Sequence, residues 1–404
     1  MRVIIEKSNP EGVVCAPPSK SMTHRMLLLA GLCEGESVIE NVELSDDVAA
    51  TVGCLRAIGA DVTNPTKTSV KVRGVDIKSI RPSSVFDCRE CGSTLRFFIP
   101  VCMVSGAPAE LTGSPRLLQR PLGAYEKIAR EQNIGFSVNE KSVNFKGPLH
   151  GGTFELPGDV SSQFVSGLLF VLPLLEDKSV IRLTGKVESR PYIDMTLDAI
   201  KRFGGEARWI SDRELLIPGR QTYHPVNALI EGDWSNAAPF FAMQYYGWDV
   251  DVKGLDTDSK QGDRVITDHL LNLSSKNEPV DLSDAPDLGP VEFAFAALKY
   301  GGRFTGVRRL RFKESDRVAA MADELRKFGC SMSCSVNDVR IGECDIRTPD
   351  CVLDGHNDHR IVMALSFLCC FTGGAIDGAE AVNKSFPGFF KELEKLKVRI
   401  TYEA

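Results

Sequence analysis

Apolar and polar residues alternate along the chain in one recurring order: a short β-like segment, a polar turn, an amphipathic helix and a second β-like segment. Six copies of the predicted helix and the strand after it can be located, at 48–63, 122–138, 195–209, 264–275, 318–334 and 389–402. In four copies a glycine follows the helix, at Gly59, Gly135, Gly204 and Gly329, where a left-handed residue would end it. The pattern predicts an α/β protein built from six similar units, with the fourth and sixth copies the weaker matches.

The two longest apolar runs, 164–175 and 361–371, break this alternation. Both are shorter than the roughly 20 residues that span a bilayer. They predict buried helices of a core and no membrane span.

Length and composition place the chain among soluble globular proteins. With 404 residues, 43% hydrophobic and 25% charged, one core would normally divide in two, so two domains are expected. The net charge of -6 argues against a protein that coats nucleic acid or binds a membrane surface, because both usually carry a basic footprint. Small molecules are the expected partners.

The twelve cysteines are expected to be free thiols of a cytoplasmic protein, because the opening MRVIIEKSNP has no signal-like apolar segment. Cys88 and Cys91 have the spacing of a metal-binding pair, but no second pair repeats it. Since a structural zinc site needs four ligands, no zinc site is expected.

The turns before the predicted helices are rich in Ser, Asp and Asn, which are the usual N-capping residues. Capping does not explain their cations, because a positive charge at a helix N-terminus opposes the helix dipole unless an anion binds there. The cations are Arg116, Arg120, Arg190, Arg264, Lys313, Arg317 and Lys384. The segment RRLRFKESDR (308–317) is therefore interpreted as one wall of an anion site, with Lys313 and Arg317 facing the ligand and Arg308, Arg309 and Arg311 mostly solvated.

Further segments carry residues suited to bind anions. Lys20, Ser21 and Arg25 begin an apolar helix, and Gly92 lies in a turn where the missing side chain lets a ligand approach the backbone. At 160–170 plain N-capping explains the serines as well as phosphate binding does. In 355–366, His356 and His359 could bind a metal, but the adjacent Arg360 disfavours a cation.

Nine blocks of the sequence, in this order and at these separations, closely resemble the EPSP synthase (3-phosphoshikimate 1-carboxyvinyltransferase) family. They read SKSMTHR, CGSTLR, LTGSPRLLQRP, SSQF, SRPYID, APDLGP, RLRFKESDR, NDHRIVM and NKSFPGFF. The resemblance covers essentially the whole chain, and KESDR and NDHR are its most specific blocks.

The resemblance implies an α/β fold of two similar domains, each of three βαβαββ units, hinged around a central cleft. One domain would comprise 1–17 plus 230–404 and the other 18–229, with hinge crossings near 17–19 and 228–233. The N-terminal strand would then belong to the domain formed mainly by the C-terminal half.

The resemblance also implies the reaction: transfer of the enolpyruvyl group of phosphoenolpyruvate to the 5-hydroxyl of shikimate 3-phosphate, with release of phosphate. Neither a metal nor an organic cofactor would be needed. The protein would be a cytoplasmic monomer of aromatic amino-acid biosynthesis and a target of glyphosate, which would occupy the phosphoenolpyruvate site.

Individual roles follow from the same resemblance. Shikimate 3-phosphate would be bound by Ser21, Arg25, Ser161, Ser162, Ser189, Asp287 and Lys313. Phosphoenolpyruvate would be bound by Lys20, Gly92, Arg120, Gln163, Arg317, Arg360 and Lys384. Asp287 is the candidate base on the hydroxyl and Glu314 the candidate acid near C3 of phosphoenolpyruvate, with Lys20 or His359 assisting.

Four positions depart from the commoner family pattern, His24, Glu90, Phe97 and Arg309, and they affect individual supporting contacts. Two alternatives stay open. One is the related transferase acting on UDP-N-acetylglucosamine, which carries a cysteine on a loop that corresponds here to the cysteine-free 114–123. The other is a non-catalytic anion-binding homologue.

Overall fold

The computed structural model describes residues 1–77, 80, 85–275 and 278–403. It divides into two compact units, which we call the terminal unit (Met1–Pro17 with Gly232–Ala404) and the inserted unit (Pro18–Glu231). The chain thus leaves the terminal unit after Pro17 and returns to it after Glu231. The resemblance had placed the crossings near 17–19 and 228–233.

The inserted unit contains three four-stranded sheets, ordered β14-β3-β5-β4, β6-β7-β9-β8 and β10-β11-β13-β12. Their strands are β3 (Gly35–Glu40), β4 (Asp61–Thr66), β5 (Ser69–Gly74), β6 (Phe86–Asp87), β7 (Ala109–Thr112), β8 (Gly135–Val138), β9 (Ser142–Lys146), β10 (Thr153–Pro157), β11 (Ser179–Thr184), β12 (Arg208–Trp209), β13 (Glu214–Ile217) and β14 (Asn227–Leu229). In each sheet the first pair is parallel and the other pairs are antiparallel. A parallel pair needs a crossover, and a helix supplies it between β6 and β7 and between β10 and β11, whereas β3 and β14 come from opposite ends of the unit.

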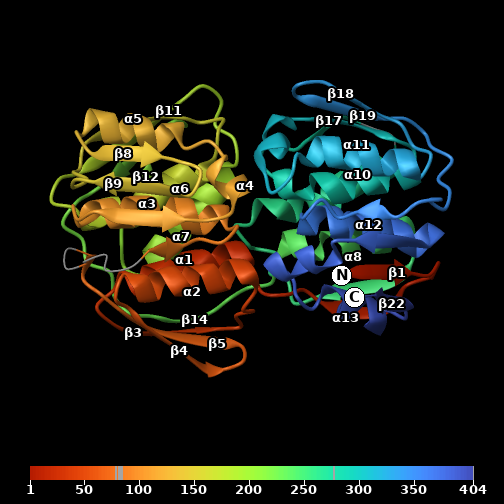
Figure 1. The fold of residues 1–404 in the computed structure, drawn as a ribbon, viewed down its shortest axis with the longest axis horizontal. Coiled ribbons are helices and arrows are strands. Elements are labelled where there is room, and N and C mark those ends of the chain that lie inside the picture. The colour runs from red at the N-terminus through yellow and green to blue at the C-terminus, as the bar shows by residue number, and fades with distance from the viewer. Residues whose placement is uncertain (78–79, 81–84, 276–277, 404) are drawn as a thin grey trace. The chain divides into compact units, whose positions relative to one another are not determined.

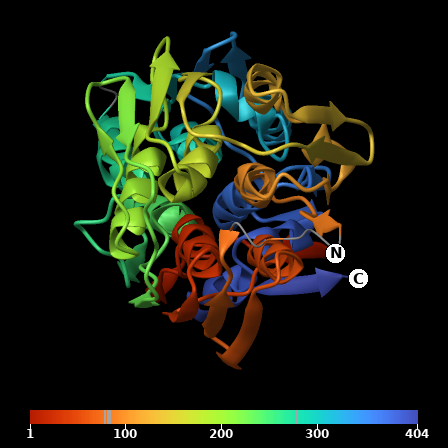
Figure 2. The ribbon, with the colours of Figure 1, turned by 90° about the vertical axis from the view of Figure 1, so that its left-hand side faces the viewer.

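The helices of the inserted unit are of two kinds, buried and amphipathic. They are α1 (Lys20–Gly31), α2 (Asp46–Ala57), α3 (Gly92–Val104), α4 (Pro115–Leu118), α5 (Gly123–Glu131), α6 (Ser162–Val171), the 3₁₀ turn η2 (Leu172–Leu174) and α7 (Arg190–Arg202). Helices α1, α3 and α6 are almost wholly buried, whereas α2, α5 and α7 bury one face only. Figure 2 shows the sheets of this unit toward its outside and the helices toward its middle.

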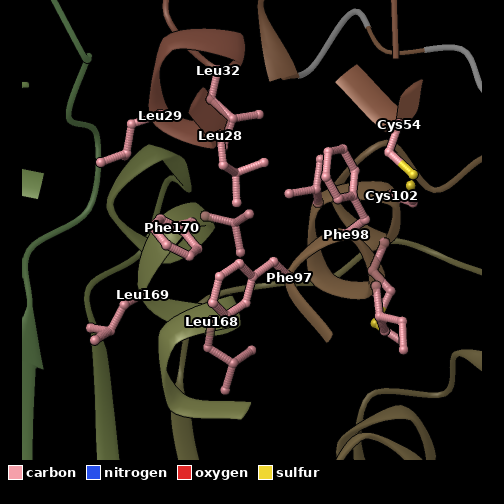
Figure 3. Packing of buried hydrophobic residues seen from close by; sticks show 14 of the residues in the cluster. Leu28, Leu29, Leu32, Cys54, Phe97, Phe98, Cys102, Leu168, Leu169 and Phe170 are labelled. Atoms are coloured by element: carbon pink, nitrogen blue, oxygen red, sulfur yellow. The ribbon is translucent and has the colours of Figure 1, made fainter. Parts of the chain in front are cut away.

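The core of the inserted unit forms where the buried helices meet. Figure 3 shows Leu28 of α1, Phe97 of α3 and Phe170 of α6 packed together. The rings of Phe97 and Phe170 meet edge to face with centroids 5.0 Å apart, a favoured aromatic geometry. The packing of these apolar side chains fixes the buried helices relative to one another. The polar residues at the N-termini of the helices are thereby fixed as well.

The terminal unit repeats this plan with sheets ordered β20-β21-β1-β22 and β16-β17-β19-β18 and the pair β15-β2. Its strands are β1 (Arg2–Ile5), β2 (Glu11–Cys15), β15 (Asp249–Lys253), β16 (Val280–Asp281), β17 (Gly302–Thr305), β18 (Met332–Cys334), β19 (Asp338–Ile341), β20 (Leu353–Asp354), β21 (Gly374–Asp377) and β22 (Ile400–Glu403). The N-terminal strands β1 and β2 both pair within this unit, as Figure 1 shows for β1 and β22.

The helices of the terminal unit again divide into buried and amphipathic. They are α8 (Trp234–Tyr246), η3 (Gly262–Val265), α9 (Ile266–Ser275), η4 (Pro286–Leu288), α10 (Gly289–Leu298), η5 (Arg308–Phe312), α11 (Arg317–Lys327), α12 (His359–Thr372), η6 (Ala379–Lys384) and α13 (Phe389–Lys395). Helices α8, α10 and α12 are buried and pack against one another, and α9, α11 and α13 bury one face.

All six predicted helices are present, and in five copies the strand predicted after the helix begins within the expected range. The exception is the weak fourth copy, where 264–275 is helical to its end and the next strand, β16, begins at Val280. The prediction that a left-handed glycine ends the helix was correct for Gly59, Gly204 and Gly329, which have positive φ. It was wrong for Gly135, the first residue of β8, because Asn133 takes the left-handed conformation after α5.

Cysteine pairing differs from the expectation of free thiols. Cys330 and Cys344 form a disulfide, joining the end of α11 to the segment after β19. The other ten cysteines are free. Among the described residues, no helix is long and apolar enough to cross a membrane.

Candidate active site

The predicted site residues fall into two groups, one in each unit, and most lie where a helix begins. Lys20 and Ser21 start α1, Gly92 starts α3, and Ser162 and Gln163 start α6. In the terminal unit, Arg317 starts α11, and His359 and Arg360 start α12. Backbone N–H groups and polar side chains therefore converge at the first turns of buried helices, which suits anion binding.

N-capping, the alternative interpretation of these turns, is also present. The hydroxyl of Ser161 accepts a hydrogen bond from the Gln163 N–H, and Asp316 and Asp358 cap α11 and α12. The caps explain the hydroxyls and carboxylates. They leave the cations of these turns to be explained by their own contacts.

Lys20 is held by a carboxylate of the neighbouring helix. Its Nζ donates to Oδ2 of Asp47, in the first turn of α2, over 2.7 Å. The side chains are 15% and 10% exposed, so the pair is shielded from water. The shielding makes this ion pair stronger than one on the surface.

Arg25 is buried one turn further along α1. Its Nε donates to the hydroxyl of Thr196 over 2.9 Å, and its Nη atoms donate to the carbonyls of Ser21 and Tyr192 over 2.7 and 2.8 Å. Burial lowers the pKa of Arg25 to about 10, so the guanidinium is still charged at neutral pH. These hydrogen-bond partners are neutral oxygens, which leaves the positive charge available to an anion.

Gly92 lies beside two guanidinium groups. A Cβ built at Gly92 would lie 2.7 Å from Nη1 of Arg120 and 3.2 Å from Nη1 of Arg96. Arg96 also donates to Oε1 of Gln163 over 2.7 Å, and the Gln163 amide donates to the hydroxyl of Ser93 over 2.9 Å. The structure therefore brings together Gly92, Arg120 and Gln163, three residues that the resemblance assigns to one ligand.

Ser189 precedes α7 in the left-handed conformation, with φ 55° and ψ 36°. It is 2% exposed, and its side chain does not cap the helix. A left-handed conformation is uncommon for a residue with a side chain and often marks a functional turn.

Arg317 is the centre of the group in the terminal unit. Its Nε donates to Asp358 over 2.9 Å, Nη1 to Asp287 over 2.7 Å and Nη2 to Glu314 over 2.8 Å. The Arg317 side chain is 1% exposed, so three carboxylates compensate one buried cation. The contacts fix the relative positions of Asp287 and Glu314, the two carboxylates predicted to move protons.

Asp287 lies among cations. Lys313 Nζ is 3.0 Å from its Oδ1, and Arg360 Nη2 is 4.0 Å from its Oδ2. Burial alone would raise the pKa of Asp287, but Lys313, Arg317 and Arg360 hold it well below its usual range. Burial lowers the pKa of Lys313, and Asp287 partly offsets that effect. The carboxylate is therefore ionised before any ligand binds.

Arg360 and Lys384 complete this group through contacts with two backbone carbonyls and a serine hydroxyl. Arg360 donates from Nη1 to the carbonyl and from Nη2 to the hydroxyl of Ser235, each over 2.6 Å. Lys384 donates from Nζ to the carbonyl of Asn357 over 2.6 Å. His359 is buried at the start of α12, with Nδ1 3.9 Å from Oδ1 of Asp358.

Three residues of these groups were given no role by the predictions from the sequence. Asp47, Asp358 and Ser235 hold Lys20, Arg317 and Arg360 in place. The acidic turn SDD at 45–47 drew attention to Asp47, but the sequence of a capping turn does not show that its carboxylate pairs with Lys20. The expectation that Arg309 is mostly solvated was wrong: it is 7% exposed and donates to the carbonyl of Ser283.

One cluster in the described part of the chain has donor atoms close enough to hold a metal ion, and it consists of His24, Asp47 and Cys91. Burial, Lys20 and Arg25 hold the pKa of His24 well below its usual range, so it is neutral. Its Nδ1 lies 2.7 Å from the Thr51 hydroxyl and its Nε2 lies 3.8 Å from Sγ of Cys91. The Lys20 ammonium already occupies Asp47, and a cation beside it would be repelled.

Comparison with solved structures defines the class of protein. EPSP synthase from Acinetobacter baumannii superposes with a TM-score of 0.79 at 20% identity, over 99% of this chain and 100% of that one. The enolpyruvyl transferase NikO from Streptomyces tendae gives 0.77 at 12% identity, over 100% and 98% of the two chains. The fold is that of the enolpyruvyl transferases, as the resemblance implied.

Sequence comparison defines the family. The model of the EPSP synthase (3-phosphoshikimate 1-carboxyvinyltransferase) family matches residues 5–393. A 3-phosphoshikimate 1-carboxyvinyltransferase of Clostridium perfringens strain 13 is 36% identical over 98% of both chains, and one of Clostridium kluyveri is 37% identical over 98% of this chain and 97% of its own. The chain belongs to the EPSP synthase family.

Proposed function

We propose that this protein transfers the enolpyruvyl group of phosphoenolpyruvate to the 5-hydroxyl of shikimate 3-phosphate, giving 5-enolpyruvylshikimate 3-phosphate and phosphate. Membership of the EPSP synthase family across residues 5–393 is the observation that carries this proposal. The geometry supports it, because both substrates are polyanions and each unit holds buried cations at helix N-termini.

The binding roles are part of the proposal. Shikimate 3-phosphate is bound by Ser21, Arg25, Ser161, Ser162, Ser189, Asp287 and Lys313. Phosphoenolpyruvate is bound by Lys20, Gly92, Arg120, Gln163, Arg317, Arg360 and Lys384. Arg25 supports the first assignment, because its neutral oxygen partners leave its charge for a phosphate. The guanidinium of Arg120 beside Gly92 supports the second, because a carboxylate or phosphate can approach where there is no side chain.

The reaction we propose is an addition followed by an elimination. A proton is added to C3 of phosphoenolpyruvate while the 5-hydroxyl oxygen attacks C2 and loses its own proton. The tetrahedral intermediate then expels phosphate from C2 and loses a proton from the C3 methyl group, which restores the double bond. Asp287 takes the hydroxyl proton, and Glu314 exchanges the C3 proton with help from Lys20 or His359.

The ion pairs in the ligand-free protein explain how Asp287 can become a base. With its pKa held low by three cations, Asp287 has little affinity for a proton. When a substrate phosphate engages Lys313, that cation stabilises the phosphate as well, and the pKa of Asp287 rises toward the range in which it accepts a proton. Substrate binding thus activates the carboxylate that the reaction needs.

Other parts of the proposal concern the working form of the enzyme. It acts in the cytoplasm as a monomer, its ligands are small molecules rather than nucleic acid or membranes, and the chemistry needs neither a metal nor an organic cofactor. Glyphosate competes for the phosphoenolpyruvate residues once shikimate 3-phosphate is bound.

The acceptor distinguishes this proposal from the related transfer to UDP-N-acetylglucosamine. The cysteine of that enzyme's loop is missing from 114–123, which favours shikimate 3-phosphate. The test is an assay of phosphate release from phosphoenolpyruvate with each acceptor in turn. We expect release with shikimate 3-phosphate alone; release only with the nucleotide sugar would favour the other transferase, and release with neither would indicate a non-catalytic homologue.

A further inference from the structure

Glu324 of α11 is a buried carboxylate that none of the proposed roles uses. It is 1% exposed. Its Oε1 lies 3.0 Å from Nε2 of His356, its Oε2 accepts the N–H of Asp354 over 3.0 Å, and Lys327 Nζ lies 2.9 Å from both oxygens. Each oxygen therefore has two donors, and one donor of each oxygen comes from the end of β20 or the turn after it.

The turn from Asp354 to Asp358 has an unusual backbone. His356 and Asn357 are consecutive residues with φ 50°, although both carry side chains. Such a conformation is unfavourable and persists only where the surroundings hold it. Here the His356 N–H donates to the Asp354 carboxylate over 2.7 Å, the Gly355 N–H donates to the Asp377 carbonyl over 2.8 Å, and Glu324 holds the His356 ring.

The other side of this turn contacts two cations proposed to bind phosphoenolpyruvate. The carbonyl of Asn357 accepts from Lys384, and the carboxylate of Asp358 accepts from Arg317. Only one residue separates His356 from Asp358. A turn fixed on one side by Glu324 therefore sets the positions of Lys384 and Arg317 on the other.

We propose that Glu324 and His356 are positioning residues for phosphoenolpyruvate: the His356–Glu324 contact holds the left-handed turn that orients Lys384 and Arg317. Neither residue touches the substrate. The inference rests on the proposed function for its kinetic effect, but the effect on the turn itself does not depend on any activity.

Protonation of His356 strengthens the contact. The charged and titratable groups facing the ring are Glu324 and Lys327 of α11 and Asp354 of β20. The hydrogen bond to Glu324 raises the pKa of His356, Asp354 adds to that effect, and burial and Lys327 oppose it. Because the pKa is raised in the folded protein, the added stability is complete below the ordinary value of about 6.5 and is lost as the pH rises through the folded value. The turn should therefore loosen, and the KM for phosphoenolpyruvate should rise, above neutral pH.

The chain offers a matched control in His269. Its Nδ1 lies 2.9 Å from Oε1 of Glu292, a carboxylate that is completely buried in the same unit. The pKa of His269 is also raised, because Glu292 outweighs the effect of burial. The charged groups that act on His269 are Glu292, Asp268 and Asp281, and none of them is proposed to bind substrate.

The experiment compares His356→Leu and His356→Gln with His269→Leu and His269→Gln in steady-state assays between about pH 6 and 9. For His356→Leu we expect the KM for phosphoenolpyruvate to rise about tenfold at pH 6.5, with kcat and the KM for shikimate 3-phosphate changed less than about threefold. His356→Gln keeps a donor but no charge, so it should behave as the wild type does above neutral pH and lack the improvement at low pH. An unchanged KM in the His356 variants, or an equal rise in the His269 variants, would overturn the proposal.

A second measurement needs no substrate. In His356→Leu, amide exchange at Gly355 and Asp358 should be at least about tenfold faster than in the wild type, and unchanged in His269→Leu. If the wild type releases no phosphate at all, the proposed function fails while this measurement still decides whether Glu324 and His356 hold the turn. Exchange that is equally slow in both variants would overturn the positioning role whatever the activity.

Discussion

The ammonium of Lys20 and the carboxylate of Asp47 form a shielded ion pair, with Nζ 2.7 Å from Oδ2, at the first turns of two neighbouring helices. A free lysine side chain has many rotamers, and the pairing fixes one of them before substrate arrives. The cation is thereby preorganised where phosphoenolpyruvate is proposed to bind.

Lys20→Met should leave the protein folded and nearly inactive, because the substitution keeps the length of the side chain and removes the charge. We expect kcat/KM to fall far more than tenfold, that is, by much more than about 1.4 kcal/mol of transition-state stabilisation. Lys71→Met is the matched control: Lys71 pairs with Glu36 over 2.9 Å on the surface of the same unit, and its loss should change kcat/KM little. Turnover of Lys20→Met within about tenfold of the wild type would remove Lys20 from the chemistry.

Gly92→Ala should weaken glyphosate binding more than phosphoenolpyruvate binding, since the added methyl group displaces the Arg120 guanidinium and glyphosate is the longer ligand. Gly92 is not among the residues with positive φ, so alanine does not strain its backbone. The measurement is the ratio of variant to wild type for the inhibition constant of glyphosate and for the KM of phosphoenolpyruvate.

Gly53→Ala in α2 controls for the general effect of alanine, because a Cβ there would meet nothing within 4 Å. Equal ratios for the two ligands in Gly92→Ala, or a melting temperature lowered by several degrees, would show that Gly92 serves the packing of the unit and not the ligand.

Asp287→Asn should lower kcat about a hundredfold or more, because an amide cannot accept the hydroxyl proton. It should also change how stability depends on pH. Since the pKa of Asp287 is depressed in the folded protein, its carboxylate contributes stability that is present above the unfolded value near 3.9 and is lost as the pH falls through the folded value. Urea unfolding should therefore show the variant least stable relative to the wild type at neutral pH, with the difference shrinking in acid. A difference independent of pH would contradict the charge assignment.

The cations of the candidate site were noticeable in the sequence because the feature that marks them, their position at the start of a predicted helix, is local. A lysine or arginine at a helix start opposes the helix dipole, so Lys313 and Arg317 were noticeable in the sequence alone. Their partners were not: Asp47 lies 27 positions from Lys20, and Asp358 lies 41 from Arg317. No periodic pattern links residues so far apart, since only the fold brings them together.

The fold shows the same division between local and long-range causes. Hydrophobic periodicity predicted the amphipathic helices, but it could not predict that β14 pairs with β3 or that β1 pairs with β21 and β22, because each pairing joins distant segments. The wrong expectation for the exposure of Arg309 has the same origin. A cation in a basic run suggests a solvated surface, yet it is buried against the carbonyl of Ser283.

The most direct test of the account is product analysis after incubation with phosphoenolpyruvate and shikimate 3-phosphate in deuterated water. Addition of a solvent proton to C3 makes a methyl group, and its later loss removes one of three hydrogens. We predict 5-enolpyruvylshikimate 3-phosphate and phosphate in equal amounts, with deuterium in the enolpyruvyl methylene, and neither product from Lys20→Met. No transfer, or transfer without deuterium at C3, would contradict enolpyruvyl transfer by addition and elimination.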